Sequence, residues 1–231
     1  MSSARPAVAA VVPALDAALF LGATLRSIVG QAPPVQEIVV VDDGSTDDTA
    51  VLARTMCPAA TVLTGHRREG ATLARARGVA ATTAEWLAFC DHDDTWPPGR
   101  LAALLAAATP QASWIAGRVH LVVEPGYRPP ASMLRADGTH VPYLIGASLI
   151  RRSVWDDLGG MEPFRTVGDD VDLYLRFRES GRQPALVDAV TLHLHLRPGT
   201  TTSNQLDQVA TLTFDAMRAA ARRRRQPGAS L

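Results

Sequence analysis

The 231-residue sequence contains no lysine, so all 23 of its basic residues are arginine. This absence excludes any mechanism that depends on a lysine amine, such as a Schiff base. Only two cysteines are present, Cys57 and Cys90, which are too few for a disulfide framework or a zinc site and indicate reduced thiols. Because 23 acidic residues cancel the arginines, the whole chain has no excess charge that would favour nucleic acid or an anionic membrane.

Long hydrophobic runs are missing as well. The first apolar stretch, from Ala7 to Leu15, is short and contains Pro13, which is unlike a signal peptide. No run reaches the roughly 18 to 20 apolar residues that cross a bilayer. We therefore expect a soluble, cytoplasmic protein. Its 47% hydrophobic and 20% charged residues are ordinary for a globular core, and the length predicts a single domain over residues 1–231.

Short β-prone runs and helical patterns alternate along the first part of the chain. Four runs are typical of buried parallel strands, namely Ala7–Val12, Glu37–Val41, Ala60–Leu63 and Trp86–Cys90. Between them, apolar residues recur at helical spacing until a glycine or proline interrupts the pattern. This order predicts an α/β fold with a mostly parallel, Rossmann-like central sheet and helices on both faces. Ligands of such sheets bind at the carboxyl ends of the strands.

The pattern changes after Pro97 and Pro98. Beyond this point we expect helices over Arg100–Ala108 and Asp169–Glu179, strands over Trp114–Val123, Gly146–Ile150 and Ala185–Val190, and a mobile Pro-rich loop from Pro125 to Pro142. The helix over Asp169–Glu179 is the clearest of these elements, because Gly181 follows its last turn.

Carboxylates gather at the ends of two predicted strands. Asp42 and Asp43 end one strand, and the run Asp91–Asp94, which includes His92, ends another. Like charges this close repel one another, and burying them unpaired is unfavourable. A divalent cation such as Mg2+, which prefers carboxylate oxygens, would neutralise them, whereas a solvated acidic turn is the alternative. Because both clusters fall at the same edge of one predicted sheet, we favour the metal site.

Four segments occur in an order and at spacings that are typical of one enzyme family. They are Val11–Asp16 (VVPALD), Val39–Asp47 (VVVDDGSTD), Asp91–Asp94 (DHDD) and Gly168–Arg176 (GDDVDLYLR). Together with Gly146–Met161, which is similar to an acceptor-side segment, they resemble family 2 glycosyltransferases from about Val8 to Ser203. The resemblance implies the GT-A fold and transfer of a sugar from a nucleotide diphosphate donor.

The resemblance implies a nucleotide-sugar-binding half over residues 6–95. Pro13, Ala14 and Asp16 would line the nucleoside pocket. Asp43 matches the carboxylate that accepts a hydrogen bond from the base, and the imide N–H of uracil is a suitable donor. We therefore expect a UDP-sugar as the donor.

The same resemblance assigns the acidic loop to a metal. Asp91 and Asp93 match the family's Asp-x-Asp motif, in which Asp93 would bind Mn2+ or Mg2+ and Asp91 would face the ribose or the metal. The ion would neutralise the charge that builds on the leaving diphosphate. His193 and His195 share one face of a strand, and His195 matches a family histidine near the metal. A pair of buried, hydrogen-bonded histidines is the alternative.

An acceptor-binding half over residues 96–205 would carry the catalytic carboxylates. Asp170 matches the family's general base for an inverting transfer, which takes the acceptor's proton. Asp169, where the family more often has glutamate, would hydrogen-bond acceptor or donor hydroxyls. The alternative is that both are helix N-terminal charges that the helix dipole favours.

Several arginines are candidates for holding the diphosphate, because a guanidinium matches phosphate oxygens; they are Arg67, Arg68, Arg75 and Arg77. The family's Ala-Arg-Asn-x-Gly motif appears here as Ala74–Gly78, with alanine in the place of asparagine. We select Arg75 first and Arg68 second.

The end of the sequence, residues 206–231, predicts a helix followed by a basic tail. The run Arg222–Arg225 could make a peripheral contact with anionic lipid headgroups, and a solvated charged terminus is the alternative.

Two other functions are compatible with parts of this pattern. A nucleotidyltransferase also pairs a parallel sheet with metal-binding aspartates, but it needs a Gly-rich phosphate loop and a basic residue, and Val12–Leu15 offers neither. A non-catalytic nucleotide-sugar-binding or scaffold protein would not need all of Asp43, Asp93 and Asp170. We expect an inverting, metal-assisted glycosyltransferase. Sugar, lipid, peptide and small natural product acceptors all remain open.

Overall fold

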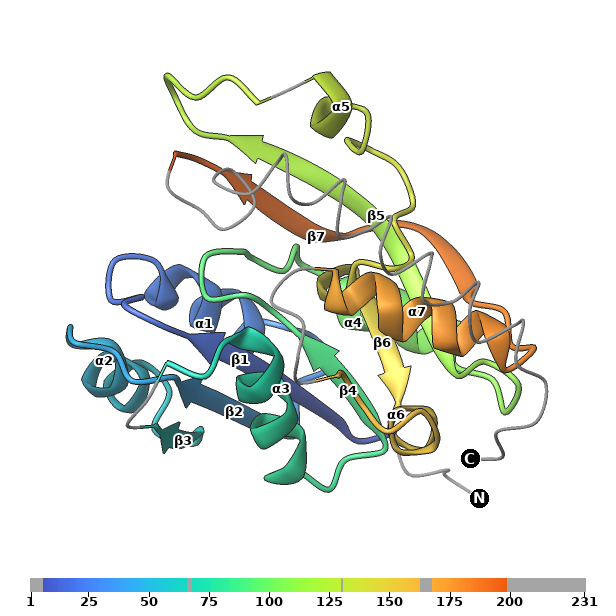
Figure 1. The fold of residues 1–231 in the computed structure, drawn as a ribbon, viewed down its shortest axis with the longest axis horizontal. Coiled ribbons are helices and arrows are strands. Elements are labelled where there is room, and N and C mark those ends of the chain that lie inside the picture. The colour runs from blue at the N-terminus through green and yellow to red at the C-terminus, as the bar shows by residue number, and fades with distance from the viewer. Residues whose placement is uncertain (1–5, 66–67, 130, 163–167, 199–231) are drawn as a thin grey trace.

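Strands and helices alternate along the chain from the first described residues onward (Figure 1). The structure is a computed structural model and describes residues 6–65, 68–129, 131–162 and 168–198. Within these ranges, seven strands form one sheet in the order β3-β2-β1-β4-β6-β5-β7. The predicted α/β fold with a mostly parallel sheet is confirmed. The predicted C-terminal helix, the run Arg222–Arg225 and Arg67 lie outside the described residues.

The first half of the chain forms the parallel part of the sheet. Its elements are β1 (Val8–Ala14), α1 (Leu21–Val29), β2 (Glu37–Asp42), α2 (Thr49–Met56), β3 (Thr61–Thr64), α3 (Ala71–Ala80) and β4 (Trp86–Phe89). Strands β2 and β4 flank β1, and β3 pairs with β2, all in parallel. All of β1 is buried, which explains why its sequence is apolar throughout instead of alternating with polar residues.

The second half adds an antiparallel strand and a long two-stranded ribbon. Its elements are α4 (Arg100–Ala106), β5 (Trp114–Val123), α5 (Ala131–Leu134), the 3-10 turn η1 (Ile145–Ala147), β6 (Ser148–Arg151), α6 (Arg152–Asp157), α7 (Asp169–Glu179) and β7 (Ala185–Leu196). Strand β6 runs antiparallel to both β4 and β5, whereas β5 and β7 pair in parallel. The predicted strand over β5 and the predicted helix over α7 are confirmed.

Two strands predicted for this half have different bounds in the structure. The last strand does not end at Val190 but continues to Leu196, because it pairs with β5 as far as Val123. Gly146 belongs to η1, not to a strand, since the N–H of Ala147 turns back to the carbonyl of Leu144.

The Pro-rich loop from Pro125 to Pro142, predicted to be mobile, contains α5. It is also hydrogen-bonded to β5, because Gly138 donates to the carbonyl of Val119 and Val119 donates to the carbonyl of Thr139.

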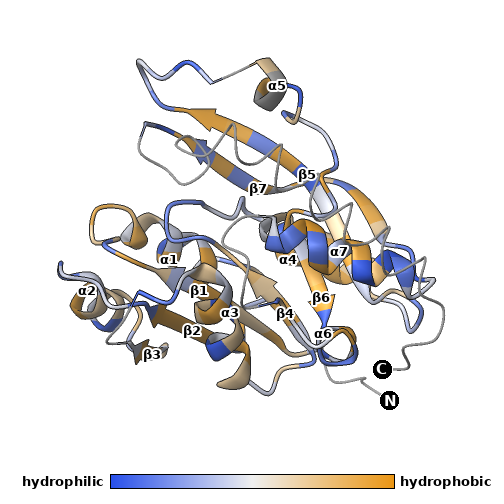
Figure 2. Ribbon diagram, viewed as in Figure 1, coloured by the Kyte–Doolittle hydropathy of each residue, from blue (hydrophilic) through white to orange (hydrophobic). Residues whose placement is uncertain are grey.

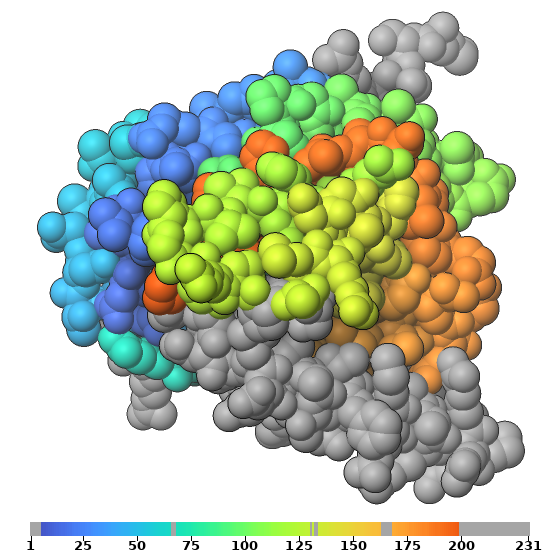
Figure 3. All heavy atoms as spheres, turned by 90° about the horizontal axis from the view of Figure 1, so that it is seen from above, coloured from blue at the N-terminus to red at the C-terminus, as the bar shows by residue number. Residues whose placement is uncertain are grey.

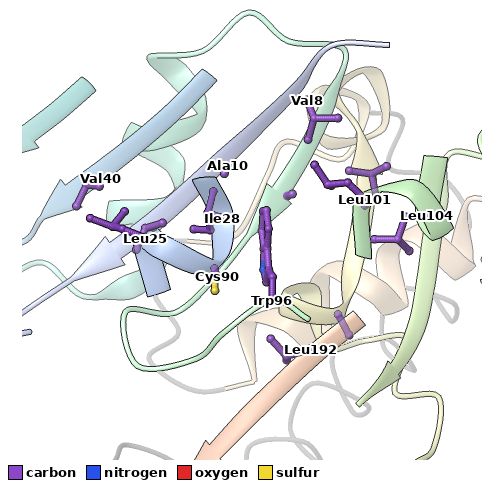
Figure 4. Close-up of a cluster of buried hydrophobic side chains, with 14 of the residues drawn as sticks. Val8, Ala10, Leu25, Ile28, Val40, Cys90, Trp96, Leu101, Leu104 and Leu192 are labelled. Atoms are coloured by element: carbon purple, nitrogen blue, oxygen red, sulfur yellow. The ribbon is translucent and has the colours of Figure 1, made fainter. Parts of the chain in front are cut away.

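Helices cover both faces of the sheet, as predicted. On one face, α1, α2 and α4 enclose the larger core, in which Trp96 lies among side chains such as Ile28 and Leu192 (Figure 4). On the other face, α3, α6 and α7 enclose a second core, where Trp155 stacks on Phe89 with 5.3 Å between ring centroids. The central strands between these layers are hydrophobic, whereas α7 mixes hydrophilic and hydrophobic residues (Figure 2).

Parts of both halves meet on one face of the molecule. Seen from above, residues 125–145 (yellow-green) cover the middle of this face, between the N-terminal half in blue and the later residues in orange (Figure 3). None of the helices within the described ranges is long and apolar enough to cross a membrane.

Candidate active site

The carboxyl ends of β1, β2 and β4 lie at one edge of the sheet, as parallel pairing requires. Ala14, the last residue of β1, is in register with Asp42, the last residue of β2. Strand β4 pairs with β1 up to Phe89, and the Asp91–Asp94 loop follows directly. Both acidic clusters therefore leave the sheet beside the end of β1. Pro13 and Ala14, predicted to line the nucleoside pocket, are buried strand residues at this edge.

Asp43 fixes the loop that precedes α3. It is only 3% exposed, and its two carboxylate oxygens accept the backbone N–H groups of Glu69 (3.1 Å) and Gly70 (2.7 Å). A buried carboxylate needs such donors, so Asp43 and this loop stabilise one another. Its predicted contact with the base stays a prediction.

Asp16 joins the loops that follow β1 and β2. Its Oδ1 accepts the N–H of Thr46 at 2.8 Å, and its Oδ2 lies 2.5 Å from Nη2 of Arg68. The hydrogen bond from the Thr46 N–H is the main reason why the pKa of Asp16 is lowered, and Arg68 adds to it. The pair places Arg68, a predicted diphosphate contact, next to a predicted nucleoside contact.

Arg75 on α3 connects the two groups of predicted site residues. Its Nη2 lies 2.6 Å from Oδ1 of Asp91, and its Nη1 lies 3.3 Å from Asp169 and 3.8 Å from Asp170. Burial alone would lower the pKa of Arg75, but the carboxylates of Asp91, Asp170 and Asp169 raise it above its usual range. One permanently charged guanidinium thus brings the Asp-x-Asp loop and the start of α7 together. Its predicted contact with the diphosphate stays a prediction.

Asp169 and Asp170 begin α7, where Gly168 adopts a left-handed conformation with φ of 81°. Asp169 accepts the hydroxyl of Thr72 at 2.7 Å, which, with Arg75, fixes its carboxylate. Oδ2 of Asp170 accepts the N–H of Ile145 at 3.2 Å. Its Oδ1 is buried and has no hydrogen-bond partner among the described residues.

The environment of Asp170 favours its protonated form. Burial, and then the neighbouring Asp169, raise the pKa of Asp170 to about 7, although Arg75 opposes the shift. A carboxylate whose pKa lies near neutrality can both accept and release a proton under ordinary conditions. This property distinguishes Asp170 from an exposed helix N-terminal aspartate.

The Asp-x-Asp loop carries more negative charge than its surroundings balance. Oδ2 of Asp93 lies 2.7 Å from Nη2 of Arg197, and buried Asp94 accepts the N–H of His195 at 2.9 Å. Burial, with repulsion from Asp91, raises the pKa of Asp93. Burial and repulsion from Asp93 and Asp91 raise that of Asp94 well above its usual value. Additional positive charge would be stabilised at this loop.

His195 lies beside this loop. Its Nε2 is 3.2 Å from the hydroxyl of Thr95, and the adjacent His193 makes two backbone hydrogen bonds with Thr95. The ring of His193 packs against His120, with 5.6 Å between centroids. Within the part of the chain that the structure describes, no three His, Cys, Asp or Glu side chains are grouped to hold a metal ion. The metal role predicted for His195 stays a prediction.

Two residues at this site were not selected from the sequence. Thr72 stands three residues before Arg75 on α3, and residues at this helical spacing share a face, so its position could have been noticed. Arg197 contacts Asp93 across 104 positions, and no local pattern indicates that contact.

The fold and this edge define a class of protein. A Rossmann-like sheet with acidic loops and arginines at its carboxyl edge is typical of proteins that bind nucleotides. A profile of the family described as Glycosyl transferase family 2 matches residues 9–167, and the chain belongs to this family.

The curated relatives match slightly less than half of this chain. The succinoglycan biosynthesis protein ExoO of Rhizobium meliloti (strain 1021) is 34% identical over 112 residues, which are 48% of this chain and 32% of ExoO. The putative teichuronic acid biosynthesis glycosyltransferase TuaG of Bacillus subtilis (strain 168) is 28% identical over 104 residues, 44% of this chain and 41% of TuaG. These matches therefore span less than half of either relative.

Solved structures share the fold over nearly the whole chain. The mannosyltransferase PcManGT from Pyrobaculum calidifontis, in complex with GDP-Man and Mn2+, has a TM-score of 0.74 at 22% identity, covering 95% of this chain and 65% of PcManGT. S. aureus TarS 1-349 in complex with UDP-GlcNAc has a TM-score of 0.69 at 18% identity, covering 93% of this chain and 65% of the TarS chain. At these identities the likeness concerns the fold, and the predicted GT-A fold is confirmed.

Proposed function

We propose that the chain is an inverting glycosyltransferase that moves a sugar from a nucleotide-diphosphate sugar to an acceptor, with Asp170 as the general base. The observation that carries this proposal is the state of Asp170. It is a buried carboxylate with a pKa of about 7, and one of its oxygens has no hydrogen-bond partner among the described residues.

The geometry around Asp170 supports the role of a base. The N–H of Ile145 holds Oδ2, which leaves Oδ1 to take the proton of an acceptor hydroxyl as that oxygen attacks the anomeric carbon. Asp169, fixed by Thr72 and Arg75, is placed to accept hydrogen bonds from sugar hydroxyls. Arg75 contacts Asp91 as well as both carboxylates. The proposed base therefore stays close to the proposed binding site of the sugar donor.

The donor half, residues 6–95, is proposed to bind the nucleotide at the carboxyl ends of β1, β2 and β4. Both solved neighbours are described with nucleotide sugars, GDP-Man in one and UDP-GlcNAc in the other, which supports a nucleotide-sugar donor. We keep UDP-sugar as the first candidate because Asp43 would accept a hydrogen bond from uracil. The acceptor half, residues 96–205, would bind a sugar, lipid, peptide or small natural product.

The Asp-x-Asp loop fits a divalent cation by its chemistry. It offers hard carboxylate oxygens, and the raised pKa of Asp93 reflects burial and a repulsion from Asp91 that a cation would relieve. Asp93 and Asp91 would hold Mn2+ or Mg2+, with His195 beside them. The bound ion would neutralise charge on the leaving diphosphate. Mn2+ accompanies the donor in the PcManGT complex, which supports the same class of ion here.

Calorimetry with UDP, dTDP and GDP, each with and without Mn2+, tests the donor site. We expect one nucleotide to bind, more tightly with Mn2+ than without it, and Asp93→Ala to abolish the effect of the metal. Absence of binding by all three would contradict the proposal.

Sugar transfer by Asp170→Asn tests the base. We expect turnover to fall by roughly 100-fold or more while nucleotide affinity is retained, because the amide cannot take the proton. Turnover equal to that of the unmodified chain would refute the assignment of Asp170. Nucleotide-sugar binding without any transfer by the unmodified chain would indicate the scaffold function. Diphosphate release from a nucleoside triphosphate and a sugar phosphate would indicate a nucleotidyltransferase.

A further inference from the structure

Arg100 places a charged guanidinium inside the larger core. It is the first residue of α4 and only 1% of it is exposed. Its Nε donates to the carbonyl of Thr191 in β7 at 2.7 Å, and its Nη2 donates to the carbonyls of Gly146 (3.0 Å) and Ser148 (2.8 Å). The guanidinium carbon lies 3.9 Å from the centre of the Trp96 ring. Arg100 therefore ties α4 to β7, η1 and β6.

This arrangement is unusual for a buried arginine. The ion pairs among the described residues give Arg100 no carboxylate partner, and its Nη1 has no hydrogen-bond partner there. Burial lowers the pKa of Arg100 to about 9, so the group is still charged at neutral pH. Burying a cation without a counterion is unfavourable, and the hydrogen bonds to the three carbonyls are what offset that cost.

Two of the carbonyls that Arg100 binds lie within, or directly after, the turn that contacts Asp170. Gly146 is the middle residue of η1, and Ser148 follows the turn. The first residue of η1, Ile145, donates its N–H to Oδ2 of Asp170. One peptide unit, between Ile145 and Gly146, separates the Ile145 N–H from the Gly146 carbonyl. A shift of that carbonyl should therefore also displace the N–H that donates to Asp170.

We propose that Arg100 is a positioning residue for Asp170, acting through η1 to keep the Ile145 N–H on the carboxylate that receives the acceptor's proton. This inference rests on the proposed function. The bond from Ile145 also lowers the pKa of Asp170, so loosening η1 should raise that pKa. The acidic limb of the rate would then move to higher pH.

The test compares Arg100→Lys with a matched control, Arg152→Lys. Arg152 also binds backbone carbonyls, those of Ala84 and Val79, but its side-chain hydrogen bonds among the described residues reach neither η1 nor Asp170. Turnover at saturating donor is measured against pH. We expect Arg100→Lys to move the acidic limb upward by about half a pH unit or more, because one ammonium cannot replace the forked contacts. Arg152→Lys should leave the limb in place.

Ile145→Pro gives a second route, because it removes the donor N–H and leaves Arg100 intact. Leu144 has φ of −81° and ψ of 102°, an extended conformation that tolerates a following proline. We expect the same upward shift as in Arg100→Lys. A limb that stays in place in both variants would refute the positioning role, even if Arg100→Lys unfolds more easily.

The proposal and the proposed function fail in different ways. If the unmodified chain transfers sugar and neither variant moves the limb, only the role of Arg100 is lost. If the unmodified chain transfers no sugar, the proposed function is lost. In that case, carboxyl NMR of protein labelled at aspartate follows the titration of Asp170 directly. An upward shift of its midpoint in Arg100→Lys would still support the positioning role, and an unchanged midpoint would overturn it.

Discussion

At the scale of single residues, the main feature of the site is Asp170, a carboxyl group whose charged form is disfavoured by its surroundings. Burial and Asp169 raise the pKa of Asp170 to about 7, from an ordinary value of 3.8. The folded chain therefore binds a proton at Asp170 between these two pH values, where the unfolded chain does not. Stability linked to this group is present at low pH and is lost as pH rises toward 7.

This sign predicts the effect of Asp170→Asn on stability. At pH 8 the variant should be more stable than the unmodified chain by roughly 1–3 kcal/mol, because the neutral amide avoids the buried charge. The difference should shrink as pH falls to 4, where Asp170 is protonated in the folded chain. Urea unfolding at both pH values measures it. The raised pKa would be contradicted if the stability gained by the variant over the unmodified chain were smaller at pH 8 than at pH 4.

At the scale of secondary-structure elements, α3 matters most because it carries both Thr72 and Arg75 and packs directly on the sheet. Its approach is close at Gly78, where an added Cβ would overlap the side chain of Val11 and lie 3.2 Å from that of Val41. Gly22 in α1 is different, since an added Cβ there would have its nearest contact, Nη1 of Arg26, at an ordinary 3.4 Å.

The two glycines form a matched pair for mutation. Gly78→Ala should lower the free energy of unfolding by about 1–3 kcal/mol, because overpacking against β1 outweighs the gain in helix propensity. Gly22→Ala should be neutral or stabilising by up to about 1 kcal/mol, since propensity alone acts there. Thermal and urea unfolding of both variants measure these changes in the free energy of unfolding. Equal effects at the two positions would show that α3 does not pack on the sheet in this way.

Prediction from sequence succeeded for elements whose local pattern determines them. Helix α7 was predicted with its observed bounds because its apolar spacing and the following Gly181 are local signals. The end of β7 was not, because its last residues become a strand by pairing with β5, more than sixty positions earlier. The prediction of a strand at Gly146 was wrong for a similar reason. Gly146 belongs to a turn that Arg100, distant in sequence, holds from α4. Long-range pairing is not encoded in local periodicity.

At the scale of the whole molecule, the second half of the chain returns to complete the acidic edge formed by the first. The described end of β7 brings Arg197 to Asp93, and the same guanidinium lies 3.4 Å from the centre of the Phe20 ring, in the loop after β1. The candidate residues of the donor half could be chosen from sequence motifs, but the contact between Arg197 and Asp93 could not be predicted from them. Arg197 thus neutralises the carboxylate that we propose to bind the metal.

The contact between Arg197 and Asp93 predicts that Arg197 competes with the metal for this carboxylate. A divalent cation and a guanidinium cannot both take Oδ2 of Asp93 at close range, so removing the guanidinium should leave the carboxylate freer to bind the cation. We expect Arg197→Met to tighten Mn2+ binding, measured by calorimetry without nucleotide, by roughly fivefold, or about 1 kcal/mol.

Two controls make the outcome specific. Arg182→Met removes an arginine that pairs with Asp157 away from the acidic edge, and it should leave Mn2+ affinity unchanged. Asp93→Asn combined with Arg197→Met should bind Mn2+ more weakly than either the single Arg197 variant or the unmodified chain. If Arg197→Met itself weakened Mn2+ binding, the guanidinium would be holding Asp93 in the orientation the cation needs. The second half of the chain would then assist metal binding at this edge instead of opposing it.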